Sequence, residues 1–349
     1  TISGGVGNTT RTPGASFEQP YTNLGGSPDV GITTASKTAT PEGVGQTRTA
    51  QTLNGYVGGI IESRDASGNF STRLLNVGDS PPSDVSITTS PSTNRVQGTI
   101  VVRNFSGSNL PGAPIATFEL GSTSGQRLAD SAFIDDRIYG MGDRREDSSR
   151  FSRVTVGASD VAVTSRTFLT SYNAAPLEDN VLPGGTTPCE CAFRSWGWWS
   201  GDVRYDDSAF RPGERDRMNL ATYVAGTLTR LVDLPNTGTA TYSGHAVGNV
   251  VNGASSYVAG GAYNNSWNFA SQTGAVSISN FDGAKYSGTT ALISGTVQFT
   301  GGITGAGRTG TVNGAFFSSP SNPVAGQAGN FSVTGTGYMA GGTFAAEKK

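Results

Sequence analysis

Residues 218–346 form a run of 129 positions with only five charged side chains, Arg230, Asp233, Asp282, Lys285 and Arg308. The other positions are mostly Gly, Ser, Thr, Asn, Val and Ala, with single aromatic or aliphatic residues at short, regular intervals. Because Gly and β-branched residues are poor helix formers, the run does not predict a helical core. The recurring aromatic residues predict strands that bury one face, which also argues against a disordered linker. The run therefore predicts a closed or stacked antiparallel β-structure whose outer face is uncharged.

Charge and hydropathy argue against nucleic acid as a partner and against a membrane-spanning segment. The 349-residue chain has a net charge of −2, so it has no overall basic field that would attract nucleic acid. It contains no run of about 18 apolar residues, so we predict no transmembrane segment. The sequence does not open with a charged and then apolar leader. A chain that starts at Thr1 is expected to be a processed product or a fragment of a longer protein.

Three regions of the chain differ in composition. Residues 1–50 are rich in Thr, Gly, Ser and Pro, with Phe17 and Tyr21 among the few large side chains. They predict an extended arm that becomes ordered on a neighbouring subunit, with a floppy tail as the alternative. Residues 51–216 predict a middle antiparallel β domain, since alternating runs such as Leu53–Ile61 are separated by turn residues. Residues 217–349 hold about eight or nine strand-length runs, starting at Leu220–Leu228, which predicts an eight-stranded antiparallel barrel. The predicted fold class is all-β.

Residue types that commonly carry catalysis are scarce. His245 is the only histidine, so a serine or cysteine nucleophile would have no other imidazole base, and alternation makes His245 an ordinary strand residue. Paired carboxylates of the glycoside hydrolase type are an alternative, but no Asp or Glu pair between 130 and 216 has a privileged spacing. The same acidic clusters would allow calcium, although none has the spacing of a twelve-residue calcium loop. We therefore predict that the protein is not an enzyme and has no catalytic residue, cofactor or metal.

The two cysteines, Cys189 and Cys191, lie two residues apart. A thiolate metal site needs three or four ligands, and the chain has only one histidine to add. Residues two apart in a strand share a face, so the pair is either two thiols or a small disulfide ring. A structural role is the prediction, with redox or metal chemistry as the alternative.

The densest group of aromatic residues lies at Trp196, Trp198, Trp199 and Tyr205. Strand alternation sends Trp196 and Trp198 to one face, where they fill a core, and Trp199 to the other. Trp199 is then either a second core residue or an exposed anchor for a carbohydrate, a heme or a partner protein. We keep both interpretations open. Trp199, Phe17 and Tyr21 are our candidate partner contacts.

The C-terminal 130 or so residues contain short Gly-rich and aromatic motifs, which include Tyr242-Ser-Gly244, Asn280-Phe-Asp-Gly283, Tyr286-Ser-Gly288, Val312-Asn-Gly314-Ala-Phe-Phe317, Ala328-Gly-Asn-Phe331 and Tyr338-Met-Ala-Gly341-Gly-Thr-Phe344. In these motifs the stretch resembles the β-barrel domain of transferrin-binding protein B-like bacterial surface proteins. It departs from that family at Asn330, where a second Gly usually precedes the aromatic residue.

A second resemblance lies just ahead of the predicted barrel. Pro188-Cys-Glu-Cys191 through Trp196-Gly-Trp-Trp199 is similar to a segment of large alphaproteobacterial surface proteins, some of which carry FecR-like domains. The resemblance implies a Gram-negative protein that is extracellular or lies at the outer-membrane surface. It carries over no ligand-contacting residue and no activity.

Taken together, these features predict a non-catalytic extracellular structural protein of a bacterial surface. We expect it to self-assemble as a homo-oligomer, filament or surface array, since the uncharged strand faces and the arm would suit contacts between subunits. The alternative is a surface binding module for an iron carrier, heme, glycan or host protein. Under the first prediction, the uncharged exterior of the barrel is where a neighbouring subunit would pack.

Overall fold

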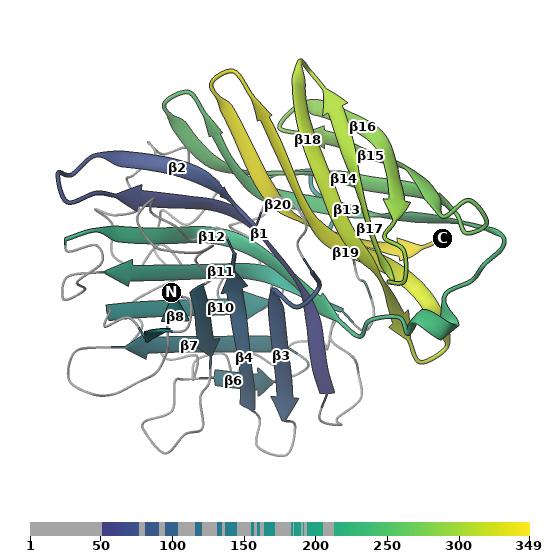
Figure 1. The fold of residues 1–349 in the computed structure, drawn as a ribbon, viewed down its shortest axis with the longest axis horizontal. Helices are drawn as coiled ribbons and strands as arrows, with labels where there is room; N and C mark the ends of the chain where they lie inside the picture. Colours follow the sequence, from purple (N-terminus) through teal and green to yellow (C-terminus); the bar gives the residue numbers. More distant parts are fainter. Residues whose placement is uncertain are drawn as a thin grey trace.

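The computed structural model describes residues 51–76, 81–90, 95–103, 116–120, 131–134, 137–144, 155–156, 159–160, 164–171, 183, 185–189, 191, 194–204 and 213–349. Within these residues the regular structure is β, apart from one short 3-10 helix, η3 (Leu231–Asp233). Two β assemblies meet near the centre of the molecule, an open sheet and a closed barrel (Figure 1). The predicted all-β class is confirmed. The predicted arm, with Phe17 and Tyr21, lies outside the described residues.

The open sheet is antiparallel and has twelve strands, in the order β6-β7-β10-β11-β12-β1-β3-β4-β5-β8-β9, with β2 paired to β1 off this path. On one edge, β1 pairs with β12 along most of its length, and on the other it pairs first with β3 and then with β2. The strands are β1 (Gln51–Arg64), β2 (Phe70–Leu75), β3 (Val85–Ser90), β4 (Arg95–Val102), β5 (Ala116–Leu120), β6 (Ser131–Ile134), β7 (Arg137–Arg144), β8 (Thr155–Val156), β9 (Ser159–Asp160), β10 (Thr164–Ser171), β11 (Arg194–Arg204) and β12 (Arg215–Gly226).

The closed barrel has eight antiparallel strands in chain order, and β20 pairs with β13 to close it. Two of its turns, Asp282-Gly283 and Ala306-Gly307, are two-residue hairpins with positive φ at both positions, which matches the right-handed twist of the strands. The strands are β13 (Thr239–Asn252), β14 (Ser255–Asn268), β15 (Thr273–Phe281), β16 (Ala284–Leu292), β17 (Gln298–Gly305), β18 (Arg308–Ser319), β19 (Asn322–Gly335) and β20 (Tyr338–Lys348). The predicted eight-stranded barrel is confirmed.

The first strand expected for the barrel belongs to the other assembly. The run Leu220–Leu228 was predicted to open the barrel, but β12 lies in the open sheet between β11 and β1. The barrel instead begins at Thr239, after a linker that contains η3. The physical reason is that β12 has apolar side chains on both faces, with Tyr223 in the core of the sheet and Val224 toward the barrel. Alternation alone does not say which assembly such a strand joins.

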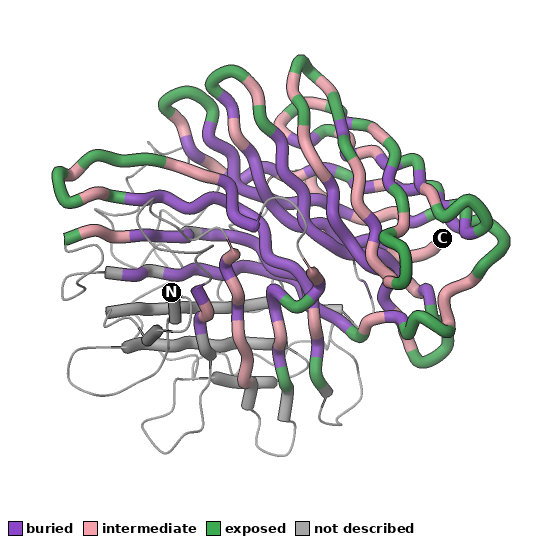
Figure 2. Tube along the Cα trace, in the orientation of Figure 1, coloured by how far each residue is buried: buried purple, intermediate pink, exposed green. Residues whose placement is uncertain are grey.

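The sheet and the barrel pack against each other through β1 and β12 on one side and β13, β19 and β20 on the other. The buried stretches of the chain run through this junction, in the centre of Figure 2. Here the two backbones approach closely: a Cβ built on Gly58 of β1 would lie 2.2 Å from the carbonyl oxygen of Gly342 in β20. Glycine at these two positions therefore lets one sheet face lie directly on the other.

Candidate functional site

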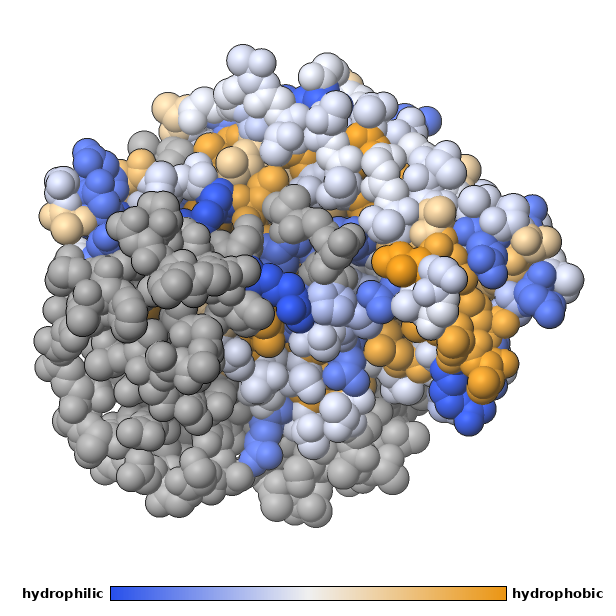
Figure 3. Space-filling view, in the orientation of Figure 1, coloured by the Kyte–Doolittle hydropathy of each residue, from blue (hydrophilic) through white to orange (hydrophobic). Residues whose placement is uncertain are grey.

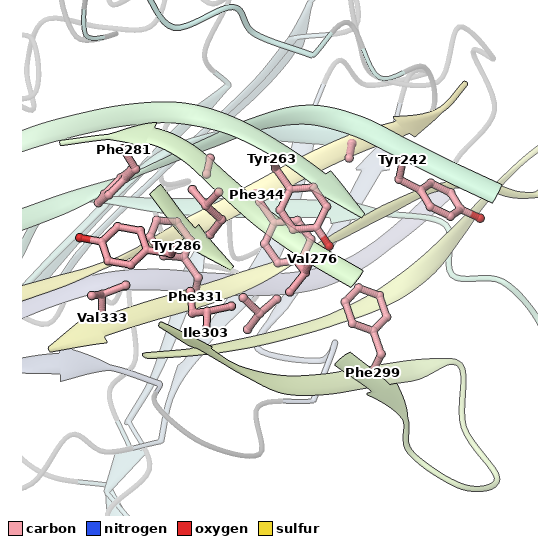
Figure 4. Packing of buried hydrophobic residues seen from close by; sticks show 14 of the residues in the cluster. Tyr242, Tyr263, Val276, Phe281, Tyr286, Phe299, Ile303, Phe331, Val333 and Phe344 are labelled. Carbon is pink, nitrogen blue, oxygen red and sulfur yellow. The ribbon is translucent and has the colours of Figure 1, made fainter. Parts of the chain in front are cut away.

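The barrel interior is a packed aromatic core. The rings of Tyr263 and Phe344 stack with centroids 4.1 Å apart, and Trp267 meets Phe316 edge to face at 5.1 Å. Figure 4 shows Tyr263 and Phe344 side by side among other apolar side chains of this core. Eight-stranded barrels are narrow enough for side chains alone to fill them. The packing points to the outside of the barrel as the place where a partner would bind.

One polar group lies inside this core. Asn265 donates to the amide oxygen of Gln327 at 3.0 Å, and the hydroxyl of Tyr263 donates to the same oxygen at 3.2 Å. All three residues are buried. Burial raises the pKa of Tyr263 above its usual value, so the phenol stays protonated and can donate. The three side chains therefore form one hydrogen-bonded group inside the core, in which Oδ1 of Asn265 and Nε2 of Gln327 have no partner among the described residues.

A charged cluster closes one end of the barrel, where several hairpin turns meet. The guanidinium of Arg308 lies 3.3 Å from the ring centroid of Tyr338 and donates to the Tyr286 hydroxyl at 2.8 Å. Asp282 accepts from the Tyr257 hydroxyl at 3.0 Å and lies 3.9 Å from Arg308. Of the five charged residues in the charge-poor run, Arg308 and Asp282 belong to this cluster. A third, Lys285, is exposed.

The uncharged outer face of the barrel is covered by the sheet over several of its strands. One cluster of buried residues joins the two assemblies: the sheet and the segment before β11 contribute Tyr56, Cys189, Cys191, Trp196, Trp198, Leu220 and Val224, and the barrel contributes Val247, Val258, Ala315, Phe317, Ala328 and Ala345. In each barrel strand these residues alternate with those that point into the interior, so they lie on the outer face. The face that we predicted as a contact between subunits is therefore, in this region, a contact within the chain.

Asparagine side chains add hydrogen bonds across the same junction. Asn330 of β19 donates to the carbonyl oxygen of Val57 at 3.1 Å, and Asn249 of β13 donates to that of Leu220 at 3.1 Å. Leu220 has a φ of 53°, and it lies where the pairing of β12 with both neighbours shifts register. The bulge turns its carbonyl out of the ladder, and the barrel amide satisfies it. These bonds fix the sheet on the barrel at defined positions.

His245 lies on the outer face of β13 inside this junction. Its Nδ1 accepts the backbone N–H of Cys189 at 2.9 Å, and its ring lies against Trp196 with centroids 4.0 Å apart. Burial lowers its pKa to about 3, so the imidazole is neutral near pH 7 and its proton is on Nε2. The contacts describe a structural histidine that bridges the two assemblies.

The other predicted site residues have different outcomes. Cys189 and Cys191 are joined by a disulfide with a Cα–Cα distance of 5.0 Å, and both are buried. Trp199 is fully buried in the core of the sheet, edge to face with Phe118 at 5.4 Å. Its interpretation as an exposed partner contact is wrong, because a second apolar layer covers the face to which alternation sends it. Phe17 and Tyr21 lie outside the described residues.

A small exposed apolar surface remains at the barrel end opposite the Arg308 cluster. We define the η3 end as Leu231 and Val232 of η3 together with Ile293 in the turn after β16; they are 51%, 85% and 36% exposed. Thr229 donates its backbone N–H to Phe316, whose own N–H bonds Val297, so the linker and this turn lie next to each other at the end of β18. Figure 3 shows apolar atoms gathered on the right of the view, the side on which Figure 1 places this linker.

The η3 end is locally ordered by polar contacts. Arg230 forms two hydrogen bonds to the carboxylate of Asp233, at 2.6 Å and 3.0 Å, across the single turn of η3. This pair neutralises both charges and leaves Leu231 and Val232 projecting from the same turn. Of the four large apolar side chains that are exposed in the described part of the chain, only Phe70 lies elsewhere. Sequence reasoning missed this surface, although four aliphatic residues close together between two strands, Leu228, Leu231, Val232 and Leu234, were its signal.

The described residues hold neither a metal-ligand cluster nor a membrane-spanning helix. No group of three or more His, Cys, Asp and Glu side chains there could hold a metal ion, and most of the acidic clusters between 135 and 207 lie outside those residues. Calcium therefore stays an untested alternative. None of the helices in the described ranges has the length and apolar character needed to cross a membrane.

Comparisons with known proteins give only distant matches. No protein-family model and no curated protein matches the sequence. Among solved structures, the chain is similar to a mutant of the vaccine antigen transferrin binding protein B from Haemophilus parasuis Hp5, at 12% identity over 88% of this chain and 78% of that one, with a TM-score of 0.31. It is also similar to isotype 1 transferrin binding protein B from serogroup B Neisseria meningitidis, at 13% identity, 86% and 77% coverage and a TM-score of 0.31.

A third solved structure is the haemoglobin receptor HpuA from Kingella denitrificans, at 13% identity, 90% and 89% coverage and a TM-score of 0.33. Transferrin binding protein B, the family that the C-terminal motifs resemble, is thus also found among the similar solved structures. At these identities and TM-scores, the likeness carries no argument about what this chain binds. An alphaproteobacterial origin and a FecR-like domain stay predictions.

Proposed function

We propose that this protein is a non-catalytic binding module of a Gram-negative bacterial surface, and that it recognises a partner protein with the η3 end. The observation that carries the proposal is the distribution of exposed apolar side chains. Part of the uncharged strand face that suggested polymerisation, on β13, β14 and β18 to β20, is buried within the chain, whereas Leu231, Val232 and Ile293 stay exposed. Exposed apolar groups that are gathered in one place commonly mark interaction sites.

The chemistry of the η3 end suits a protein partner. Its apolar centre is bordered by the neutralised Arg230–Asp233 pair and by Thr and Ser residues, a pattern of apolar core and polar rim. The packed barrel interior offers no comparable place for heme or another small ligand. Self-assembly into a filament or surface array is the weaker candidate, because the outer faces of β13 and β18 to β20, which helped to motivate it, are in part buried within the chain.

The first probes are haemoglobin and transferrin, since the solved structures described above include a haemoglobin receptor and transferrin binding proteins. We expect a monomeric chain in light scattering and saturable binding to one of these proteins in biolayer interferometry. The double variant L231S/V232S should bind at least about tenfold more weakly, a loss of about 1.4 kcal/mol, because a few central residues carry most of the binding energy of an interface. Its circular dichroism and melting temperature should match wild type, since neither side chain is buried.

The matched control is F70S, which removes an exposed aromatic residue from β2, outside the η3 end. It should bind as wild type does. If neither protein binds the wild-type chain, recognition of these host proteins is contradicted. Concentration-dependent polymers that L231S/V232S disperses would instead make the η3 end a self-contact.

A further inference from the structure

The segment that precedes β11 lies on the outer face of the barrel at β13 and β14. Thr186 fills the space above Gly260 of β14, where a Cβ would lie 2.0 Å from the Thr186 hydroxyl oxygen. Three residues later, the backbone N–H of Cys189 donates to Nδ1 of His245 on β13 at 2.9 Å. Two contacts on neighbouring barrel strands therefore hold this short stretch against the barrel.

The Cys189–Cys191 disulfide lies at the end of this stretch. Both cysteines belong to the buried cluster that includes Val247 and Val258 of the barrel, with Cys189 9% exposed and Cys191 1% exposed. The bond ties residues two apart in the sequence, so it restricts the local backbone and keeps both sulfurs on the barrel side. Without it, two separate thiol side chains and the backbone between them would have to be ordered by packing alone.

We propose that the Cys189–Cys191 disulfide is a redox-sensitive clasp, whose reduction by a dithiol loosens the segment around Thr186 and Cys189 from the barrel. A thiolate of the dithiol attacks Sγ of Cys189, which belongs to the more exposed of the two residues, and Cys191 leaves as a thiolate that then takes a proton. The second thiol of the reductant resolves the mixed disulfide and releases Cys189 as a thiol. The protein gains two electrons and two protons, and the dithiol becomes a cyclic disulfide.

Opening the clasp would uncover a strip of barrel surface that has no charge. His245 of β13 and Gly260 of β14 lie on the outer faces of neighbouring strands, and Cys189 and Thr186 contact them. His245 would lose the N–H donor that it now accepts. Since the barrel's own hydrogen-bond ladder and aromatic interior do not involve the disulfide, we expect β15 to β17 to stay folded when the clasp opens.

The test is hydrogen exchange measured by mass spectrometry on the full-length chain, before and after treatment with dithiothreitol. Two thiols per chain should become titratable in folded protein, as judged by circular dichroism. Exchange in the peptide that contains Thr186 and Cys189 should accelerate on the order of tenfold, the change expected when a three-residue loop is no longer closed. Peptides from β15 to β17 should not change.

Two variants separate the clasp from general loosening. C189S/C191S should exchange like the reduced wild type without reductant and should not respond to dithiothreitol. H245A should accelerate exchange at Cys189 in the oxidised chain, and reduction should then add less than it does in wild type, because both changes release the same contact. Thiols that appear without any change in exchange would overturn the proposal, as would a disulfide that is reduced only in unfolded chains.

Discussion

His245 shows how one residue can join two assemblies. Its ring lies against Trp196 of β11, and its only acceptor nitrogen accepts the backbone N–H of Cys189, in the segment that precedes β11. Because the site is desolvated, a positive charge on this ring would lack solvation. A proton on Nδ1 would also displace the hydrogen bond that Nδ1 accepts from the Cys189 N–H. That is the physical reason for its lowered pKa.

This lowered pKa predicts an acid-sensitive stability. The folded pKa is about 3 and the unfolded value is 6.5, so between these values the unfolded chain binds the extra proton. The contribution of His245 is therefore complete above pH 6.5 and is lost as the pH falls toward 3, at about 1.4 kcal/mol per pH unit. Urea unfolding at pH 7.5, 5.5 and 4.5 should show this slope on top of the carboxylate contribution. H245N keeps an acceptor but does not titrate, so its slope should be smaller; equal slopes in the two proteins would contradict the assignment.

At the scale of strands, glycine sets how the sheet meets the barrel. Gly58 of β1 faces Gly342 of β20, and a Cβ built on Gly341 would lie 2.7 Å from the carbonyl oxygen of Gly59. Side chains at these positions would push the backbones apart and open the layer that buries Val247 and Trp198. Part of the chain's high glycine content is thus a packing requirement and not only a turn signal.

A pair of matched glycine substitutions tests this requirement. G58A places a methyl group against the Gly342 carbonyl, so we expect a loss of unfolding free energy of about 3 kcal/mol or more. G302A adds the same methyl group to the exposed face of β17, where the nearest atom is 3.9 Å away, and should change stability by less than about 0.5 kcal/mol. Chemical denaturation of both variants gives the comparison. A G58A protein as stable as G302A would show that β1 and β20 are not in close contact.

At the scale of the whole molecule, part of the fold follows from the sequence. The period-2 pattern predicted the strands, Gly-rich spacing predicted the eight-stranded barrel, and the alternation of Trp196, Trp198 and Trp199 predicted which two share a face. The sequence did not predict which element packs on each strand face, because alternation shows that a face is uncharged but not what covers it. His245 and Cys189, for example, are 56 residues apart, with no local pattern that pairs them.

One sequence signal for the covered face was present. From His245 to Val251 every residue of β13 is buried, whereas in β15 buried and more exposed positions alternate. A run of apolar and small residues without alternation is typical of a strand that is covered on both sides. Reading β13 in this way would have predicted that its outer face is covered, although not by which part of the chain or by which partner. The η3 end would then have been the remaining exposed apolar surface.

Thiol labelling at two positions on the outer face of the barrel distinguishes a face covered by the chain itself from one open to other subunits. The native cysteines are tied in a disulfide, so an introduced cysteine is the only free thiol. With maleimide under native, non-reducing conditions, S287C on β16 should label completely, because Ser287 is exposed. V247C on β13 should stay protected until the chain is unfolded in urea, because the sheet covers Val247. Equal labelling rates for both variants in a dilute monomer would contradict the intramolecular cover.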